Sequence, residues 1–227
     1  METKLPQCQR FQNQNIEVIN FGVGDYGTAQ EYMTLKHHVS EYSPDLVVLA
    51  VFTGNDIINN SKNLSPDDRF SPFLLKKEGK YVMDLSFKET ETYQWRNSLT
   101  RRAIFSTINN SRILQLVNET RVAMKKRRQL LGSQTETENK DVLQYLDFNP
   151  ELYKNSDPNW QEAWNITEEL IKLIQLETQS MNSDLLVVTL SNPAQVYPDA
   201  AYREQYFKQA EVKDTFYPEE RLSLIHI

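Results

Sequence analysis

The first clear pattern of apolar positions is a strand, a helix and a second strand within residues 16–52. Residues 16–21 are rich in β-branched side chains and lead into a glycine-containing turn at residues 22–27. From Thr28 onward the apolar spacing is helical, with Thr28 expected as the N-cap residue and Glu31 three positions later. The unbroken apolar run at residues 46–52 is typical of a strand that is buried on both faces of a parallel sheet.

Further elements follow along the chain. Residues 185–190 form the third strong strand pattern, and residues 80–85 form a weaker one. The capping acid Asp157, followed by proline, predicts a helix that continues to about residue 180. Helical patterns also cover residues 98–131, 202–210 and the segment from residue 219 onward, whereas residues 132–159 are polar and indicate a loop.

Strands alternating with helices indicate an α/β fold with a parallel sheet and helices on both faces, a three-layer α/β/α arrangement. Such sheets usually have about five strands, and only three firm strands are visible, so we expect a domain that is incomplete at both ends. The chain reads as one domain, residues 1–227, with a long and mostly helical insertion at residues 57–158.

The composition of the chain argues against several classes of function. The net charge of -6 argues against binding to a nucleic-acid backbone, and no apolar run approaches the ~20 residues of a membrane span. The single cysteine, Cys8, excludes an internal disulfide and a site built from several thiolates. We therefore expect no nucleic-acid partner and no transmembrane segment in this chain. The first residues show no apolar stretch that would indicate a signal peptide.

The glycine turn supports two hypotheses. Gly22, Gly24 and Gly27 match the spacing of a dinucleotide-binding fingerprint, in which backbone N–H groups face a pyrophosphate. The acid expected at the end of the next strand arrives late, as Asp56 after Gly54, and Asp25 within the turn would repel a phosphate. The dinucleotide hypothesis is therefore the weaker of the two.

The second hypothesis uses the same two strand ends as an oxyanion hole. Consecutive parallel strands bring their C-terminal loops to one edge of the sheet. One loop offers backbone N–H groups near Gly24 and Asp25, and the other offers the carboxamide of Asn55, which follows Gly54. A backbone N–H and an asparagine side chain together stabilise the negative charge that develops on an ester carbonyl under attack.

The residues that carry this hypothesis resemble the second and third motif blocks of the SGNH (GDSL-type) hydrolases. The matching segments are Asn-Phe-Gly-Val-Gly-Asp-Tyr-Gly at residues 20–27, Pro-Asp-Leu-Val-Val-Leu at residues 44–49 and Gly-Asn-Asp at residues 54–56. The resemblance implies a flavodoxin-like α/β/α fold and an ester hydrolase. In this comparison Asn55 supplies the oxyanion side chain and the N–H of Asp25, or alternatively of Gly24, supplies the second donor. Asn20, Gly22, Gly27, Gly54 and Asp56 would support the two turns.

The sequence also departs from the family pattern. It contains neither the Gly-Asp-Ser nucleophile segment nor the Asp-x-x-His base segment, so nucleophile and base are expected outside these 227 residues. The chain by itself is predicted to be inactive. The resemblance implies a lipid, carbohydrate or small-molecule ester as substrate, no cofactor, no metal ion, and an exported or membrane-anchored bacterial protein. The alternative is a non-catalytic SGNH-like module that binds a carbohydrate or a partner protein.

Three further features have simpler explanations. His37 and His38 are expected to lie on the helix surface rather than to act as a base or metal ligands, and His226 has no context that places it. The two tryptophans Trp160 and Trp164 are one helical turn apart, which favours core packing over stacking on a sugar. The basic residues 125–128 are expected to be a solvated helix end.

Overall fold

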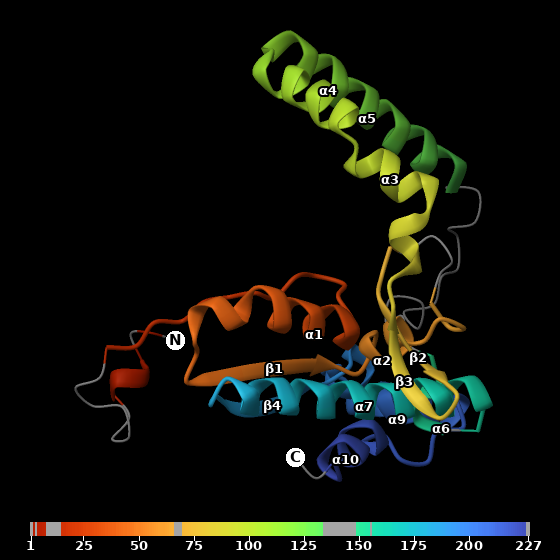
Figure 1. Ribbon diagram of the computed structural model, residues 1–227. Helices are drawn as coiled ribbons and strands as arrows, with labels where there is room; N and C mark the ends of the chain where they lie inside the picture. Colours follow the sequence, from red (N-terminus) through yellow and green to blue (C-terminus); the bar gives the residue numbers. More distant parts are fainter. Residues whose placement is uncertain are drawn as a thin grey trace.

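The computed structural model describes residues 2, 4–7, 15–65, 70–133, 149–154 and 156–225 (Figure 1). Its strands are β1 (Leu46–Phe52), β2 (Phe73–Lys77), β3 (Lys80–Asp84) and β4 (Asp184–Leu190). Its α-helices are α1 (Thr28–His37), α2 (Asp56–Asn60), α3 (Glu91–Asn97), α4 (Leu99–Asn110), α5 (Arg112–Ser133), α6 (Glu151–Lys154), α7 (Pro158–Ser180), α8 (Pro193–Val196), α9 (Ala200–Gln209) and α10 (Tyr217–Ser223). Short 3₁₀ turns occur at Leu5–Gln7, Val39–Tyr42 and Ser86–Glu89.

The centre of the fold is a parallel pair of strands, β1 and β4, in register from Leu46 opposite Asp184 to Phe52 opposite Leu190. Both strands match the sequence prediction, and so does the mixed α/β class. Because the pair is parallel, both strands deliver their carboxyl ends to the same edge of the sheet. The loops that follow β1 and β4 therefore lie together at that edge.

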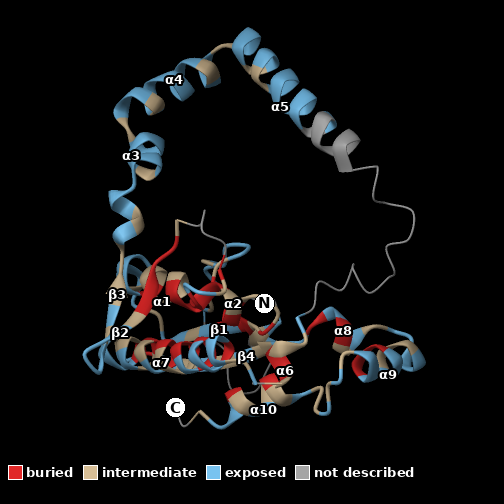
Figure 2. Ribbon diagram, turned by 90° about the vertical axis from the view of Figure 1, so that its right-hand side faces the viewer, coloured by how far each residue is buried: buried red, intermediate tan, exposed pale blue. Residues whose placement is uncertain are grey.

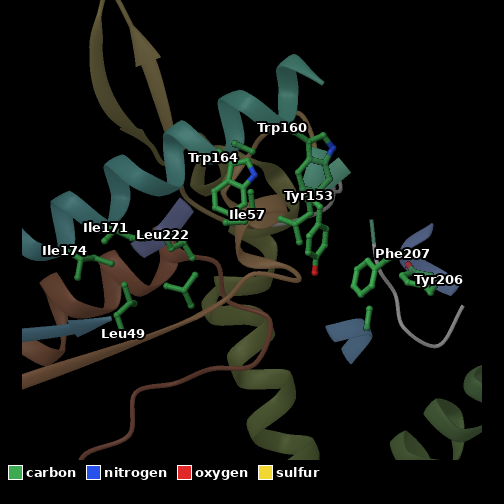
Figure 3. Close-up of a cluster of buried hydrophobic side chains, with 14 of the residues drawn as sticks. Leu49, Ile57, Tyr153, Trp160, Trp164, Ile171, Ile174, Tyr206, Phe207 and Leu222 are labelled. Carbon is green, nitrogen blue, oxygen red and sulfur yellow. The ribbon is translucent and has the colours of Figure 1, made fainter. Parts of the chain in front are cut away.

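Helices α1 and α7 cover one face of this pair (Figure 1). Asp157 accepts hydrogen bonds from the N–H groups of Asn159 and Trp160, which begins α7 at the predicted position. Apolar side chains of α7 then recur at helical spacing and pack against Leu49 of β1 and Leu35 of α1. Figure 3 shows this cluster, which also includes Ile57 of α2 and Trp164 at 0% exposure.

The opposite face of β1 and β4 is not covered by any element that the structure describes. Along β1, Leu46 and Val48 are about half exposed, and along β4 Leu186, Val188 and Leu190 are exposed to a similar degree. The prediction that residues 46–52 are buried on both faces is therefore wrong for the described part of the chain. The structure shows helices on one side of a small parallel sheet.

Residues 16–21 do not form a strand, contrary to the sequence prediction. They run as irregular chain before α1, with Val18 and Ile19 each about 40% exposed. A strand is stabilised by a neighbour that accepts its backbone hydrogen bonds, and β1 has β4 as its only partner among the described residues. The β-branched composition of this segment was not sufficient to specify a strand without that partner.

The predicted insertion contains two kinds of structure. The expected strand at residues 80–85 is confirmed as β3, which pairs with β2 in an antiparallel hairpin through the turn at Glu78 and Gly79. The helix expected over residues 98–131 is confirmed but is interrupted at Ser111, which separates α4 from α5. With α3 these helices form an arm that projects away from the body of the protein (Figures 1 and 2).

The C-terminal part packs back onto the body through short helices. Helix α9 and helix α10 confirm the helical patterns expected there, and α6 interrupts what was expected to be a loop. Tyr206, Phe207 and Leu222 from these helices join the buried cluster of Figure 3. Cys8 and His226 lie outside the described residues.

Candidate functional site

The turn at residues 22–27 is organised by hydrogen bonds to its own backbone. Oδ1 of Asn20 accepts a hydrogen bond from the N–H of Gly22 at 2.8 Å, which forms an Asx turn. The N–H of Tyr26 donates to the carbonyl of Val23 at 3.3 Å. Asn20 and Gly22 are thus joined within the turn by this hydrogen bond.

Asp25 has a left-handed backbone with φ of +68°. Glycine adopts this conformation most easily, although aspartate tolerates it better than most residues. Gly24, the alternative donor, has no positive φ, and an added β-carbon would meet no atom within 4 Å.

Helix α1 begins one residue earlier than predicted. Gly27, not Thr28, is the N-cap residue, and its N–H donates to Oε1 of Gln30 at 3.1 Å. The expectation that Glu31 completes the cap is wrong, because Gln30 occupies the third helical position after Gly27. Thr28 is instead completely buried.

The second loop follows β1 and consists of Thr53, Gly54, Asn55 and Asp56. Asn55 is the N-cap residue of α2, yet its side chain accepts no capping hydrogen bond from the helix. Its carbonyl accepts the N–H of Asn59 at 2.8 Å, so the main chain fixes its position. Asn55 is half-buried at the edge of the sheet. Its carboxamide does not cap the helix.

Helix α2 joins the two loops. Nδ2 of Asn59 donates to the carbonyl of Asp25 at 3.4 Å, and Oδ1 of Asn60 accepts the N–H of Ala29 at 3.1 Å. A β-carbon on Gly27 would lie 2.8 Å from Cβ of Asn59, so the turn and the helix are in direct contact. Asn55 precedes α2 as its N-cap, so this helix connects the Asn55 loop to the turn.

A shallow depression of about 220 Å³ borders this turn. Its lining consists of Gly24, Asp25, Tyr26, Gln30, Phe70 and Ser71. The depression borders the turn, and residues 54–56 are not among its lining residues. The turn and the loop after β1 are connected through helix α2.

Behind the two loops lies a pair of buried acids that sequence reasoning did not single out as a pair. Burial, and then the proximity of Asp56, raises the pKa of Glu31 to about 8. Burial raises the pKa of Asp56 to about 7, although the N–H of Phe52, 2.7 Å from its Oδ2, opposes the rise. This hydrogen bond connects Asp56 to the end of β1. Asp56 is not among the residues that line the depression.

The loop after β4 adds Asn192, which sequence reasoning missed. Asn192 is 4% exposed, and its Nδ2 donates to Oγ1 of Thr53 at 2.9 Å and to the hydroxyl oxygen of Tyr153 at 3.1 Å. A polar residue directly after the third predicted strand was the signal that could have identified it, by the same rule that identified Asn55. Asn192 connects the two strand ends through side chains.

Other candidates lie elsewhere. His37 and His38 are exposed at the end of α1, and Trp160 and Trp164 are buried in the core, as expected. Within the part of the chain that the structure describes, no group of three or more His, Cys, Asp or Glu side chains is arranged to hold a metal ion. No helix in that part is long and apolar enough to cross a membrane.

Comparison of the chain with family models, with curated proteins and with solved structures found no match.

Proposed function

We propose that this chain supplies the oxyanion side of an ester hydrolase of the SGNH type. The observation that carries the proposal is the junction between the Asp25 turn and helix α2, in which Asn59 donates to the Asp25 carbonyl. This junction supports the pairing of a backbone N–H with the Asn55 carboxamide at one edge of a parallel sheet. That is the donor combination that stabilises a tetrahedral oxyanion.

In the proposed reaction, a serine hydroxyl attacks the carbonyl carbon of an acyl or acetyl ester while a histidine takes its proton. The carbonyl oxygen becomes negatively charged and accepts hydrogen bonds from Asn55 and from the turn at residues 24 and 25. The alkoxide leaves with the proton held by histidine, and water then releases the acyl group. The serine and histidine belong to motif segments that the 227 residues do not contain, so the proposal places both outside this sequence.

Two measurements test the proposal. The 227-residue chain should not hydrolyse p-nitrophenyl acetate above the uncatalysed rate. The longer protein read from the same gene should hydrolyse it, and Asn55→Ala should lower kcat by ~10²–10³ because one oxyanion donor is lost. Asn97→Ala is the matched control, because Asn97 lies on exposed helix α3, where its side chain donates to the Tyr93 carbonyl within the same helix. This variant should retain full activity.

A longer protein without ester hydrolysis would overturn the proposal in favour of a binding module. Full activity in Asn55→Ala would overturn the role of that residue. Activity of the 227-residue chain itself, lost in Asn55→Ala, would show that the nucleophile lies within this sequence.

A further inference from the structure

Charge is distributed very unevenly along this acidic chain. Residues 92–133, which we call the basic arm, contain nine lysine and arginine residues and one acid, Glu119. The basic arm therefore has a net charge of +8, which leaves -14 on the rest of the chain. An acidic protein that concentrates positive charge in one segment presents a local electrostatic surface that its net charge conceals.

The basic arm comprises most of α3 and all of α4 and α5, and it extends away from the body (Figure 2). Figure 2 colours most of its described residues as exposed. Helix α4 contacts α5, and Nε2 of Gln115 on α5 donates to the carbonyl of Asn109 on α4. This hydrogen bond lies at the junction between the two helices.

One side of α5 carries four exposed apolar side chains, with Thr120 between them. Ile113, Leu116, Val117 and Met124 fall on one side of the helix by their spacing of 3, 4 and 11 residues from Ile113. Their exposed fractions are 75%, 63%, 58% and 65%. A helix of a globular protein normally packs such an apolar stripe against the core, whereas α5 exposes it to solvent.

Positive charge borders this stripe. Arg121 and Lys125 are both exposed and lie one helical turn apart, beside Val117 and Met124. Elsewhere on the basic arm, Arg102 of α4 is exposed and Trp95 of α3 is 56% exposed. An exposed apolar stripe with basic residues along its margin is the pattern of a helix that lies in the headgroup region of a lipid bilayer.

We propose that the basic arm docks on the surface of a bilayer that contains anionic lipids. The apolar stripe of α5 would enter the boundary between headgroups and acyl chains, and the flanking basic residues would contact lipid phosphates. Pairing of the stripe with the arm of a second copy fits less well, because two arms of charge +8 repel each other. A nucleic acid would use the positive charge but would leave the apolar stripe in water.

The test is flotation of the whole 227-residue chain with vesicles in a density gradient. Vesicles of phosphatidylcholine with about a third phosphatidylglycerol should bring the protein to the top, and vesicles of phosphatidylcholine alone should not. Raising the salt to about 0.5 M should weaken binding, because it shortens the screening length to a few ångströms.

Two variants separate the contributions of charge and apolar contact. R121E/K125E and L116S/M124S should each lower vesicle affinity about tenfold or more, because the first variant removes attraction to lipid phosphates and the second removes apolar contact with the acyl chains. The matched control is K77E/K80E, which reverses two exposed lysines on the β2–β3 hairpin and should bind like the original chain. Far-ultraviolet circular dichroism confirms that every variant is folded.

Equal binding to neutral and anionic vesicles would overturn the proposal, and so would an equal loss in the K77E/K80E control. Binding of a short DNA duplex without binding to anionic vesicles would assign the arm to a nucleic acid instead. Concentration-dependent self-association without vesicle binding would assign the stripe to a second copy. This inference does not depend on the proposed hydrolase activity, because flotation requires no turnover.

Discussion

A β-carbon on Gly54 would lie 2.4 Å from Oδ1 of Asn192, so the loops after β1 and β4 are in direct contact at the edge of the sheet. The same β-carbon would lie 2.6 Å from the ring of Phe52. Glycine is therefore needed at this position because the two loops approach each other closely, and not because the backbone adopts a positive φ. This contact holds the Asn55 loop against the loop that follows β4.

Gly54→Ala should destabilise the protein by about 1–3 kcal/mol, because the added methyl group overpacks the contact with Asn192 and Phe52. Urea denaturation followed by circular dichroism measures the change. Gly24→Ala is the matched control, since its β-carbon would meet no atom within 4 Å, and it should change stability by less than about 1 kcal/mol. Similar losses in both variants would contradict the contact described for Gly54.

Asp25→Gly should stabilise the fold by about 0.5–1 kcal/mol, because φ of +68° costs an L-residue more than it costs glycine. The corresponding control is Asp45→Gly, since Asp45 is exposed and is not among the residues of positive φ. That variant should lose stability through the greater entropy of the unfolded chain. Urea midpoints that fall in Asp25→Gly would show that the aspartate side chain is itself needed by the turn.

The buried acids predict that stability falls as pH rises. Because the folded protein raises the pKa of Glu31 to about 8 and of Asp56 to about 7, it binds protons more tightly than the unfolded chain does. Their contribution is fully present below about pH 4 and is lost progressively up to about pH 8. Urea midpoints measured between pH 5 and pH 8 should therefore decrease.

Glu31→Gln should remove part of this dependence and should stabilise the protein at pH 8 by about 1 kcal/mol more than at pH 5. The structure supports a neutral side chain here, because Oε2 of Glu31 is buried without a hydrogen-bond partner in the described part of the chain. Glu204→Gln on the exposed surface of α9 is the control and should leave the pH dependence unchanged. If stability depended on pH in Glu31→Gln as it does in the original chain, the raised pKa of Glu31 would be refuted.

Asn192→Ala should destabilise the protein by about 1–3 kcal/mol, because it leaves the hydroxyls of Thr53 and Tyr153 without their shared donor. Thermal unfolding measures the loss. Asn97→Ala serves again as control, since Asn97 is exposed and makes a single hydrogen bond within its own helix. A midpoint unchanged in Asn192→Ala would mean that water replaces the carboxamide at little cost.

Local patterns were sufficient where an element depends on its own residues. Asp157 and Pro158 specified the start of α7, and the apolar run at residues 46–52 specified β1, because capping and β-branched composition act over a few residues. The edge of the sheet at which Asn55 lies followed from the order of strands and helices alone. The hydrogen bonds that support this edge could not be predicted in the same way, because Asn59, Asn60 and Asn192 bond to residues that are distant in the sequence.

The sequence by itself thus determined the α/β class, most helix and strand positions and the residues of the candidate edge. The tertiary structure decided the rest. It left residues 16–21 without a strand partner and one face of β1 uncovered, because pairing and burial depend on elements distant in the chain. It also turned the apolar stripe of α5 outward, which no periodicity can reveal, since spacing defines a helix face but not what covers it.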